Sequence, residues 1–291
     1  DGGRTFTKGA VVRTLRYVDT AGVSHTTAFD QPGAPSDQPE LANLVGFRTN
    51  TYPTACVNNG LVYVGWTERG WGPPHDDPPR RDARIVYSTS SSSDGLQWSA
   101  PQAVDNHSGL GHQFMPSFGC AAGRVTAVWY DQRSDQWALQ PQNGFGTFMY
   151  DADPQPTPFR TIDVRAAQGG SPFGPSVQVS RYLFGVTTTN LILQLEKNYE
   201  NYKLFAGGTR PFIGDYIEVA AAPSIVYSSN PGWHFNTDPD TATTSHVVWA
   251  DNRDARRPLD GNWFNWTPAG TCEPGQVLAP RQTRSRDQNI Y

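Results

Sequence analysis

The chain has 291 residues, a formal net charge of −4 and only 17% charged residues, together with 28 Gly and 24 Pro. A chain of this length can bury a large core without the help of metals, and its composition excludes a disordered or coiled-coil protein. The near-neutral charge argues against nucleic acid or an anionic membrane as partner, and no apolar stretch approaches the ~18 residues of a transmembrane helix. The surplus of turn-forming residues and the 12% of aromatic residues favour an all-β fold.

The first predicted element is a tight turn at the start of the chain, where Asp1, Gly3 and Phe6 stand at the spacing of an Asp–Gly–aromatic turn. In such a turn the Asp accepts backbone hydrogen bonds, the Gly supplies a positive φ and the aromatic ring packs under the hairpin. A second turn of this kind, shorter by one residue, is predicted further along from Ser92, Asp94, Gly95 and Trp98.

An internal repeat follows, because Pro53 and Pro116, and likewise Trp66 and Trp129, are each 63 residues apart. Residues 61–66 and 125–129 alternate apolar and polar side chains, which predicts a strand in each copy. A further strand is predicted 21 residues after each Trp, ending at Tyr87 in the first copy and at Tyr150 in the second. A third copy contains Trp249 and is followed by a strand at the chain end, residues 288–291.

Each copy is expected to contain four short strands, and radially repeated four-stranded units are the blades of a β-propeller. The predicted units lie near residues 45–100, 112–165 and 205–291, with long insertions at 11–48, 153–210, 223–245 and 254–286. Only residues 191–202 have a spacing that could form a helix. Three units are fewer than a closed ring usually contains, so the sequence predicts an incomplete segment of a larger propeller.

The Asp-containing turns resemble the Asp-box, or BNR repeat, of sialidase-like β-propellers, whose pattern is Ser-x-Asp-x-Gly-x-Thr-Trp. The Trp-x-Asp-x-Arg strand ends and residues 212–216 extend this resemblance to bacterial secreted proteins of the class. The resemblance implies a secreted or cell-surface β-propeller and, in catalytic members, sialoside hydrolysis by an arginine triad, a Tyr–Glu pair and an Asp acid/base. The family's Phe/Tyr-Arg-Ile-Pro motif is absent, and Asp215 and Tyr216, on an expected innermost strand, are the catalytic candidates.

Most insertions follow a second or fourth strand and are therefore expected on one face of the propeller, whereas 223–245 is expected on the opposite face. Function concentrates on long loops held by a rigid scaffold, so the first face is the predicted binding surface. Its candidate ligand-binding residues are an acid with an Arg in each unit and aromatic side chains that could stack on sugar rings: Glu68, Arg69, Trp71, Asp131, Arg133, Asp251, Arg253 and Trp263. The alternative is that the acid–Arg sets are structural salt bridges and the aromatic residues are buried.

Cys56 and Cys120 occupy nearly the same position in adjacent units, where inner strands converge, and a disulfide between them is one expectation. Cys272 would then be free or would pair with a Cys outside the given residues. No cofactor is expected. Calcium binding by residues 238–240 or 75–77 is an alternative to their being solvated turns.

Three functions remain open at this point. The chain is a noncatalytic extracellular module that binds a glycan or a protein, an exo-glycosidase of sialidase type, or a structural subunit of an extracellular assembly. The expected partners are accordingly a carbohydrate, a protein, or further chains or blades.

Overall fold

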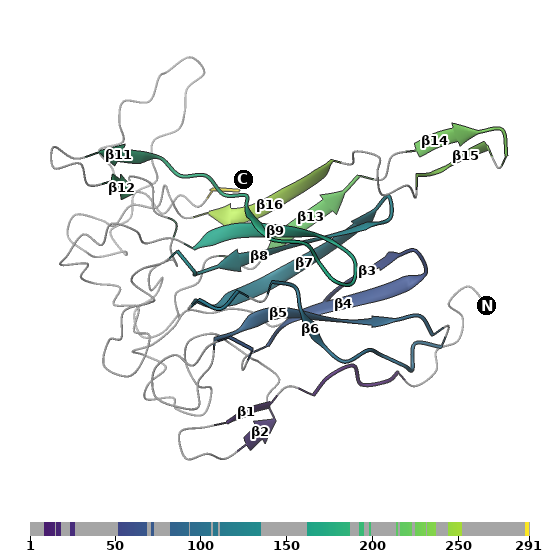
Figure 1. The fold of residues 1–291 in the computed structure, drawn as a ribbon, viewed down its shortest axis with the longest axis horizontal. Helices are drawn as coiled ribbons and strands as arrows, with labels where there is room; N and C mark the ends of the chain where they lie inside the picture. The colour runs from purple at the N-terminus through teal and green to yellow at the C-terminus, as the bar shows by residue number, and fades with distance from the viewer. Residues whose placement is uncertain are drawn as a thin grey trace, which may run out of the picture.

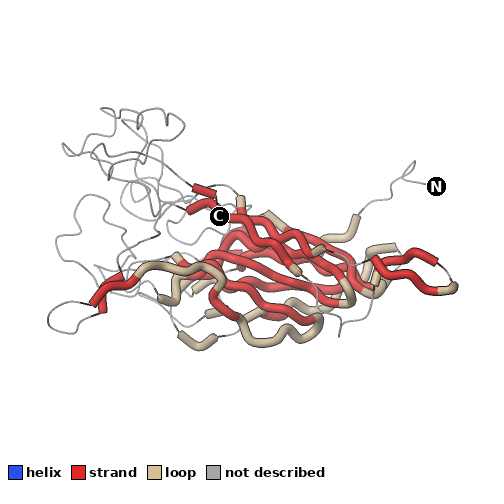
Figure 2. The backbone as a smooth tube through the Cα atoms, turned by 90° about the horizontal axis from the view of Figure 1, so that it is seen from above, coloured by secondary structure: helices blue, strands red, loops and turns tan. Residues whose placement is uncertain are grey.

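The computed structural model describes residues 9–14, 16–18, 24–26, 52–68, 71–72, 82–92, 94–105, 107–109, 111–134, 162–186, 192–194, 198, 214, 216–222, 225–230, 232–236, 244–251 and 289–290. All regular structure within these residues is β-strand, and every strand pairing is antiparallel (Figures 1 and 2). The prediction of an all-β chain is confirmed. Within the segment of helical spacing, residues 191–202, the described residues 192–194 form strand β12 (Ile192–Gln194).

Two sheets of four strands each form the centre of the structure. The first sheet contains β3 (Thr54–Asn58), β4 (Leu61–Glu68), β5 (Arg84–Ser90) and β6 (Gln102–Ala103), paired in chain order. The second sheet repeats this arrangement with β7 (Gln113–Ala121), β8 (Arg124–Asp131), β9 (Asp163–Gly169) and β10 (Val177–Gln178).

A third sheet lies beside the second and contains β13 (Ile217–Ala221), β16 (Ser245–Asp251) and β17 (Asn289–Ile290), in this spatial order. The pairing of β17 with β16 confirms the strand expected at the chain end. Three separate two-stranded pairs complete the described structure: β1 (Arg16–Val18) with β2 (Ser24–Thr26), β11 (Phe184–Val186) with β12, and β14 (Ile225–Ser228) with β15 (Gly232–Phe235).

The first two strands of each four-stranded sheet are joined by a two-residue hairpin turn. The turn residues Asn59 and Gly60 have φ values of 48° and 77°, and Ala122 and Gly123 have nearly the same values of 47° and 72°. Two successive residues with positive φ form the turn type that matches the right-handed twist of paired strands. The predicted repeat therefore preserves the same turn geometry, even where Ala replaces Asn.

The sheets pack face to face through two apolar cores, and the second sheet contributes to both. Its strand β8 is buried along nearly its whole length, as expected for a strand covered on both faces. Side chains of the first and second sheets form one core, with Tyr63, Tyr87, Phe118 and Trp129 among its largest members. Side chains of the second and third sheets form the other core, with Phe114, Tyr130, Ile162 and Ile217 among its members.

Gly65 permits the close approach of the first two sheets. A Cβ atom placed on Gly65 would lie only 2.3 Å from the ring of Phe118 in the second sheet. Because Gly65 has no side chain, β4 leaves space at this point, and the ring of Phe118 fills it.

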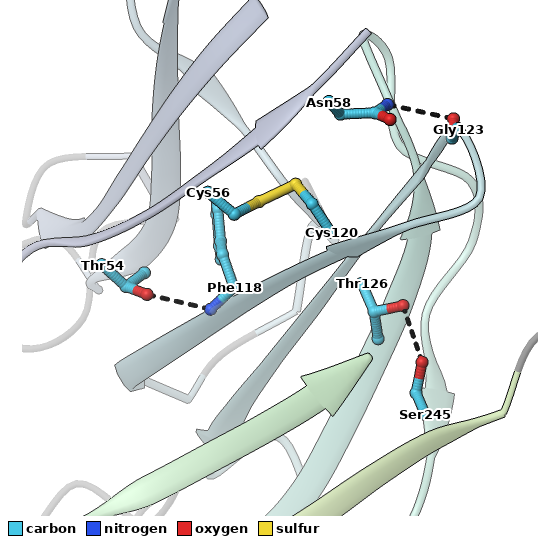
Figure 3. The surroundings of a disulfide bond; sticks show 8 residues. All are labelled: Thr54, Cys56, Asn58, Phe118, Cys120, Gly123, Thr126 and Ser245. Atoms are coloured by element: carbon cyan, nitrogen blue, oxygen red, sulfur yellow. Dashed lines mark hydrogen bonds between the residues drawn. A yellow bond between two sulfur atoms is a disulfide. The ribbon is translucent and has the colours of Figure 1, made fainter. Parts of the chain in front are cut away.

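The adjacent strands β3 and β7 are not paired as neighbours in a sheet, yet several side chains connect them (Figure 3). A disulfide joins Cys56 to Cys120, and the Asn58 side-chain amide donates to the carbonyl of Gly123 at 3.0 Å. The disulfide is thus the pairing that the sequence analysis raised. Corresponding contacts between the second and third sheets include the hydrogen bond between Thr126 and Ser245 at 3.2 Å.

The strand connections alternate between two ends of the sheets. We call the end where β4, β8 and β16 finish the acid end, because Glu68, Asp131 and Asp251 lie there. We call the opposite end, with the turns β3–β4, β5–β6, β7–β8 and β9–β10, the turn end (Figure 1). The insertion between β13 and β16 contains the β14–β15 hairpin and lies at the turn end, as expected for residues 223–245.

One predicted strand is wrong. The third strand of the second unit was expected to end at Tyr150, but β8 pairs with β9, in which Asp163 stands opposite Asp131. Residues 146–150 lie outside the described part of the chain. The 63-residue repeat holds for the second strands of the two sheets and ends there, because the connection from β8 to β9 is longer than that from β4 to β5. The second sheet therefore extends to Gln178, beyond the expected boundary at residue 165.

Candidate functional site

The same contact between a Trp and an acid occurs at the acid end of all three sheets. The indole Nε1 of Trp66 donates to Glu68 at 2.9 Å, that of Trp129 donates to Asp131 at 3.0 Å, and that of Trp249 donates to Asp251 at 3.2 Å. In each case the acid follows the Trp by two residues, so both side chains point to the same face of the strand. The repeated Trp-x-acid pattern thus specifies a repeated hydrogen bond.

Arginine side chains neutralise two of these acids. Arg13 donates to Glu68, and Arg133 makes a bidentate pair with Asp131 through Nε at 2.9 Å and Nη2 at 2.7 Å. Glu68 is 5% exposed and Asp131 is fully buried. The Asp131–Arg133 pair agrees with the structural alternative for that acid–Arg set, whereas Glu68 pairs with Arg13, which the sequence analysis did not single out.

Arg133 also reaches a second acid, Asp105, which lies between the first and second sheets. Burial opposes ionisation of Asp105, but hydrogen bonds from Ser176 and Arg133 outweigh it and lower the pKa of this carboxyl. The positive charge of Arg133 is therefore shared between two carboxylates, and the sequence contains no signal that joins residues 105 and 133.

Arg84, at the start of β5, is fully buried, and no carboxylate within the described residues accepts a hydrogen bond from it. Its guanidinium donates instead to backbone carbonyls, including those of Gly109 at 2.7 Å and Gly111 at 2.8 Å. Burial lowers the pKa of Arg84. This side chain holds the segment that connects β6 to β7.

Two titratable side chains near this network have strongly shifted pKa values. Burial raises the pKa of Asp163 to about 6, and the negative charge of Asp131 adds to the effect. Its Oδ1 accepts from Gln178 at 3.2 Å, whereas its Oδ2 has no hydrogen-bond partner among the described residues. Burial and the charges of Arg133 and Arg84 lower the pKa of His107 to about 4.

The candidate ligand-binding residues therefore differ from one another in their placement. Glu68, Asp131 and Asp251 are buried at the strand ends rather than on an exposed rim, because indole and guanidinium groups enclose the first two and Trp249 bonds the third. Trp71, beyond the end of β4, is half-buried. The remaining candidates, Arg69, Arg253 and Trp263, lie outside the described residues.

The turn between β5 and β6 has the contacts expected of an Asp-containing turn. The backbone N–H of Leu96 donates to Asp94 at 3.0 Å, and that of Gln97 donates to the hydroxyl of Ser92 at 3.2 Å. Gly95 has a φ of 67°, and the Trp98 indole donates to its carbonyl at 2.9 Å. The corresponding residues at the chain start, Asp1, Gly3 and Phe6, lie outside the described part.

The two catalytic candidates do not form a described site. Tyr216 immediately precedes β13 and is 80% exposed, so its side chain does not line a buried cavity. Asp215 lies outside the described residues. The structure thus provides no contact that assigns a catalytic role to this pair.

No group of three or more His, Cys, Asp or Glu side chains within the described ranges is placed to hold a metal ion. Residues 75–77 and 238–240, the calcium alternatives, fall outside those ranges. In the part of the chain with described structure, no helix has the length and apolarity needed to cross a membrane.

No protein-family model and no curated protein matches the chain. Several solved structures show a weak likeness. One of them is Zg3597, a family 117 glycoside hydrolase from Zobellia galactanivorans, with 14% identity, coverage of 73% of this chain and 68% of that chain, and a TM-score of 0.28. Others are a mutant Trypanosoma rangeli sialidase with trans-sialidase activity (8% identity, 86% of this chain, 38% of that chain, TM-score 0.28) and a Bacteroides ovatus glycosyl hydrolase (11% identity, 84% of this chain, 72% of that chain, TM-score 0.23). TM-scores below 0.5 carry no argument about the fold or activity of this chain.

Proposed function

We propose that this chain is a noncatalytic extracellular module of sialidase-like β-propeller type, an incomplete segment of a larger propeller, that binds a glycan or a protein through the loops at its acid end. The observation that carries the proposal is the recurring Trp–acid contact in all three sheets. The Trp and acid side chains are engaged with each other at the strand ends. Recognition is therefore assigned to the loops that follow β4, β8 and β16.

The burial of Asp163, the acid whose pKa is raised, supports a noncatalytic role. Glycoside hydrolysis uses a carboxyl group of raised pKa that touches the substrate. Asp163 has such a pKa, of about 6, but it is only 1% exposed and stands on β9 opposite Asp131 of β8. Because this carboxyl is buried among packed strands, it has no exposed surface with which to touch a substrate, and we assign it a structural role.

Two measurements on the purified chain test the proposal. Incubation with a fluorogenic sialoside is expected to release no fluorophore while circular dichroism shows the chain to be folded. The wild type is expected to bind at least one member of an immobilised glycan panel or of an extracellular protein library that Trp71→Ala no longer binds, while the midpoint of thermal unfolding of this variant is unchanged.

Trp233→Ala, an exposed Trp at the turn end, is the matched control and is expected to retain the acid-end binding. Sustained sialoside cleavage would establish the exo-glycosidase alternative, and a Trp71→Ala variant that unfolds would make this Trp a core residue. Light scattering is expected to show a monomer, whereas a defined oligomer would favour a structural subunit of an assembly.

A further inference from the structure

The β14–β15 hairpin presents one uninterrupted apolar face at the turn end. Register places Tyr227 opposite Trp233 and Ile225 opposite Phe235, so these two adjacent cross-strand pairs point to the same side. Their exposed fractions are 67%, 74%, 59% and 64%, respectively, whereas Val226 on the other side is half-buried. Large apolar side chains are usually buried, whereas all four of these are exposed to solvent.

The hairpin extends away from the three sheets in both views (Figures 1 and 2). The rings of Tyr227 and Trp233 contact each other at a centroid distance of 5.3 Å with an interplanar angle of 62°. This edge contact fixes the two rings relative to each other before any ligand arrives, which reduces the entropy lost on binding.

We propose that this face of the hairpin is a second binding site, specific for a neutral carbohydrate whose sugar rings stack on the aromatic side chains. An exposed aromatic face with polar edges complements a pyranose, which has C–H bonds on its faces and hydroxyl groups around its rim. The hydroxyl of Tyr227 and the indole N–H of Trp233 supply hydrogen-bonding groups beside the rings.

The area of the face argues for a ligand smaller than a folded protein. Aromatic side chains carry about 150–250 Å² each, so the exposed fractions of these four residues correspond to roughly 500 Å² in total. A stable protein interface needs about 800 Å² from each partner. The face is therefore too small for a firm contact with a second copy of this chain and large enough for a short oligosaccharide.

The charge of the hairpin argues for a neutral ligand. Residues 225–230 and 232–236 contain no Asp, Glu, Lys or Arg, so the surface offers no ion pair to an acidic sugar. The tip of the hairpin is polar, and the hydroxyl of Ser228 donates to the carbonyl of Asn230 at 2.9 Å. Without Lys or Arg in residues 225–230 and 232–236, the hairpin also lacks the electrostatic attraction to anionic lipids that strengthens interfacial membrane binding.

This site is separate from the surface assigned under the proposed function, because it lies at the opposite end of the sheets. Its test is isothermal titration of the full chain with cellohexaose, chitohexaose and mannohexaose in turn. Saturable binding of at least one of them is expected. Trp233→Ala and Tyr227→Ala are each expected to weaken that binding about tenfold or more.

Two controls keep the outcome decisive. Trp71→Ala at the acid end is expected to bind the oligosaccharide like the wild type, and both hairpin variants are expected to keep the thermal unfolding midpoint, since the mutated side chains are open to solvent. Absence of binding to all three oligosaccharides, or wild-type binding in Trp233→Ala, would overturn the proposal.

Two further measurements identify the alternative occupants. Sedimentation velocity over a range of concentrations detects self-association, and flotation with phosphatidylcholine/phosphatidylglycerol vesicles detects membrane binding. Either behaviour, if abolished by Trp233→Ala while the oligosaccharides fail to bind, would assign the face to a second copy or to a lipid surface and overturn the carbohydrate assignment.

Discussion

The indole Nε1 of Trp129 donates to Oδ2 of Asp131 at 3.0 Å, and the same carboxylate accepts a bidentate contact from Arg133. Asp131 is fully buried, so these donors replace the water that its charge would otherwise bind. The other two sheets repeat the contact between Trp and acid, so this relationship recurs at the acid end of each of the three sheets.

Replacing Asp131 by Asn is expected to lower the free energy of unfolding by about 2–4 kcal/mol, because Arg133 would lose the charge of one partner while remaining partly buried. Urea denaturation followed by tryptophan fluorescence measures the change. Glu218→Gln is the matched control, since Glu218 is exposed on β13 and its substitution should change stability by less than about 0.5 kcal/mol. Equal effects of the two substitutions would show that the Asp131 network does not stabilise the fold.

The contact between Gly65 and Phe118 leads to a second prediction. Gly65→Ala is expected to destabilise the chain by about 1–3 kcal/mol, because the new Cβ would overlap the aromatic ring. The penalty should shrink in a Phe118→Leu background, where the ring is absent, and a double-mutant cycle of denaturation midpoints measures this coupling. A penalty that is identical in both backgrounds would mean that the ring does not occupy the space above Gly65.

Asp163 is expected to make stability depend on pH. Its pKa in the fold, about 6, lies above the ordinary value of 3.8, so the folded chain binds a proton more tightly than the unfolded chain. This group therefore costs stability above pH 6 and ceases to do so as the pH falls through 6 toward 4.

Asp163→Asn is thus expected to stabilise the chain at pH 8 by up to about 2–3 kcal/mol, with a gain that fades below pH 5. The Asn carbonyl can still accept from Gln178. The difference between the two stability curves is the readout, because His107, whose pKa is lowered to about 4, titrates in both proteins and cancels. A gain independent of pH would show that Asp163 is ionised throughout.

The disulfide between Cys56 and Cys120 closes a loop with a sequence separation of 64 residues. Chain-entropy arguments assign a loop of this length about 4 kcal/mol of stabilisation. A Cys56→Ser, Cys120→Ser double variant is expected to lose an amount of this order in chemical denaturation. Addition of a reductant should lower the stability of the wild type to that of the variant, and an unchanged wild type under full reduction would contradict the prediction.

The sequence repeat predicted β4, β8 and β16 because each combines alternating apolar residues with a Trp at the same distance from the strand end. It also marked Cys56 and Cys120 as equivalent, and their strands do lie side by side. Local pattern was sufficient here, because strand periodicity and hairpin turns depend on neighbouring residues.

The repeat did not locate β9, because the 21-residue spacing after Trp129 points to residues 146–150, whereas Asp163–Gly169 pairs with β8. The longer connection between β8 and β9 breaks the register of the repeat, and spacing alone does not reveal its length. Nor does spacing reveal that Asp105 meets Arg133, or that the acids at the strand ends are buried, since both depend on how two sheets pack. The open face of the β14–β15 hairpin was missed for a related reason: alternation predicts which side chains share a face, but not whether that face is covered.

The position of the second sheet between the other two has a consequence for how the chain opens. Its strands β7 and β8 contribute to both cores, while Tyr130 both donates to and accepts from the backbone of Ala250 in the third sheet. The first or third sheet can separate at the expense of one core, whereas exposure of β8 requires the loss of both. Amide protons of β8 should therefore exchange with solvent only through global unfolding, and the chain behaves as a central cooperative unit flanked by two that can open alone.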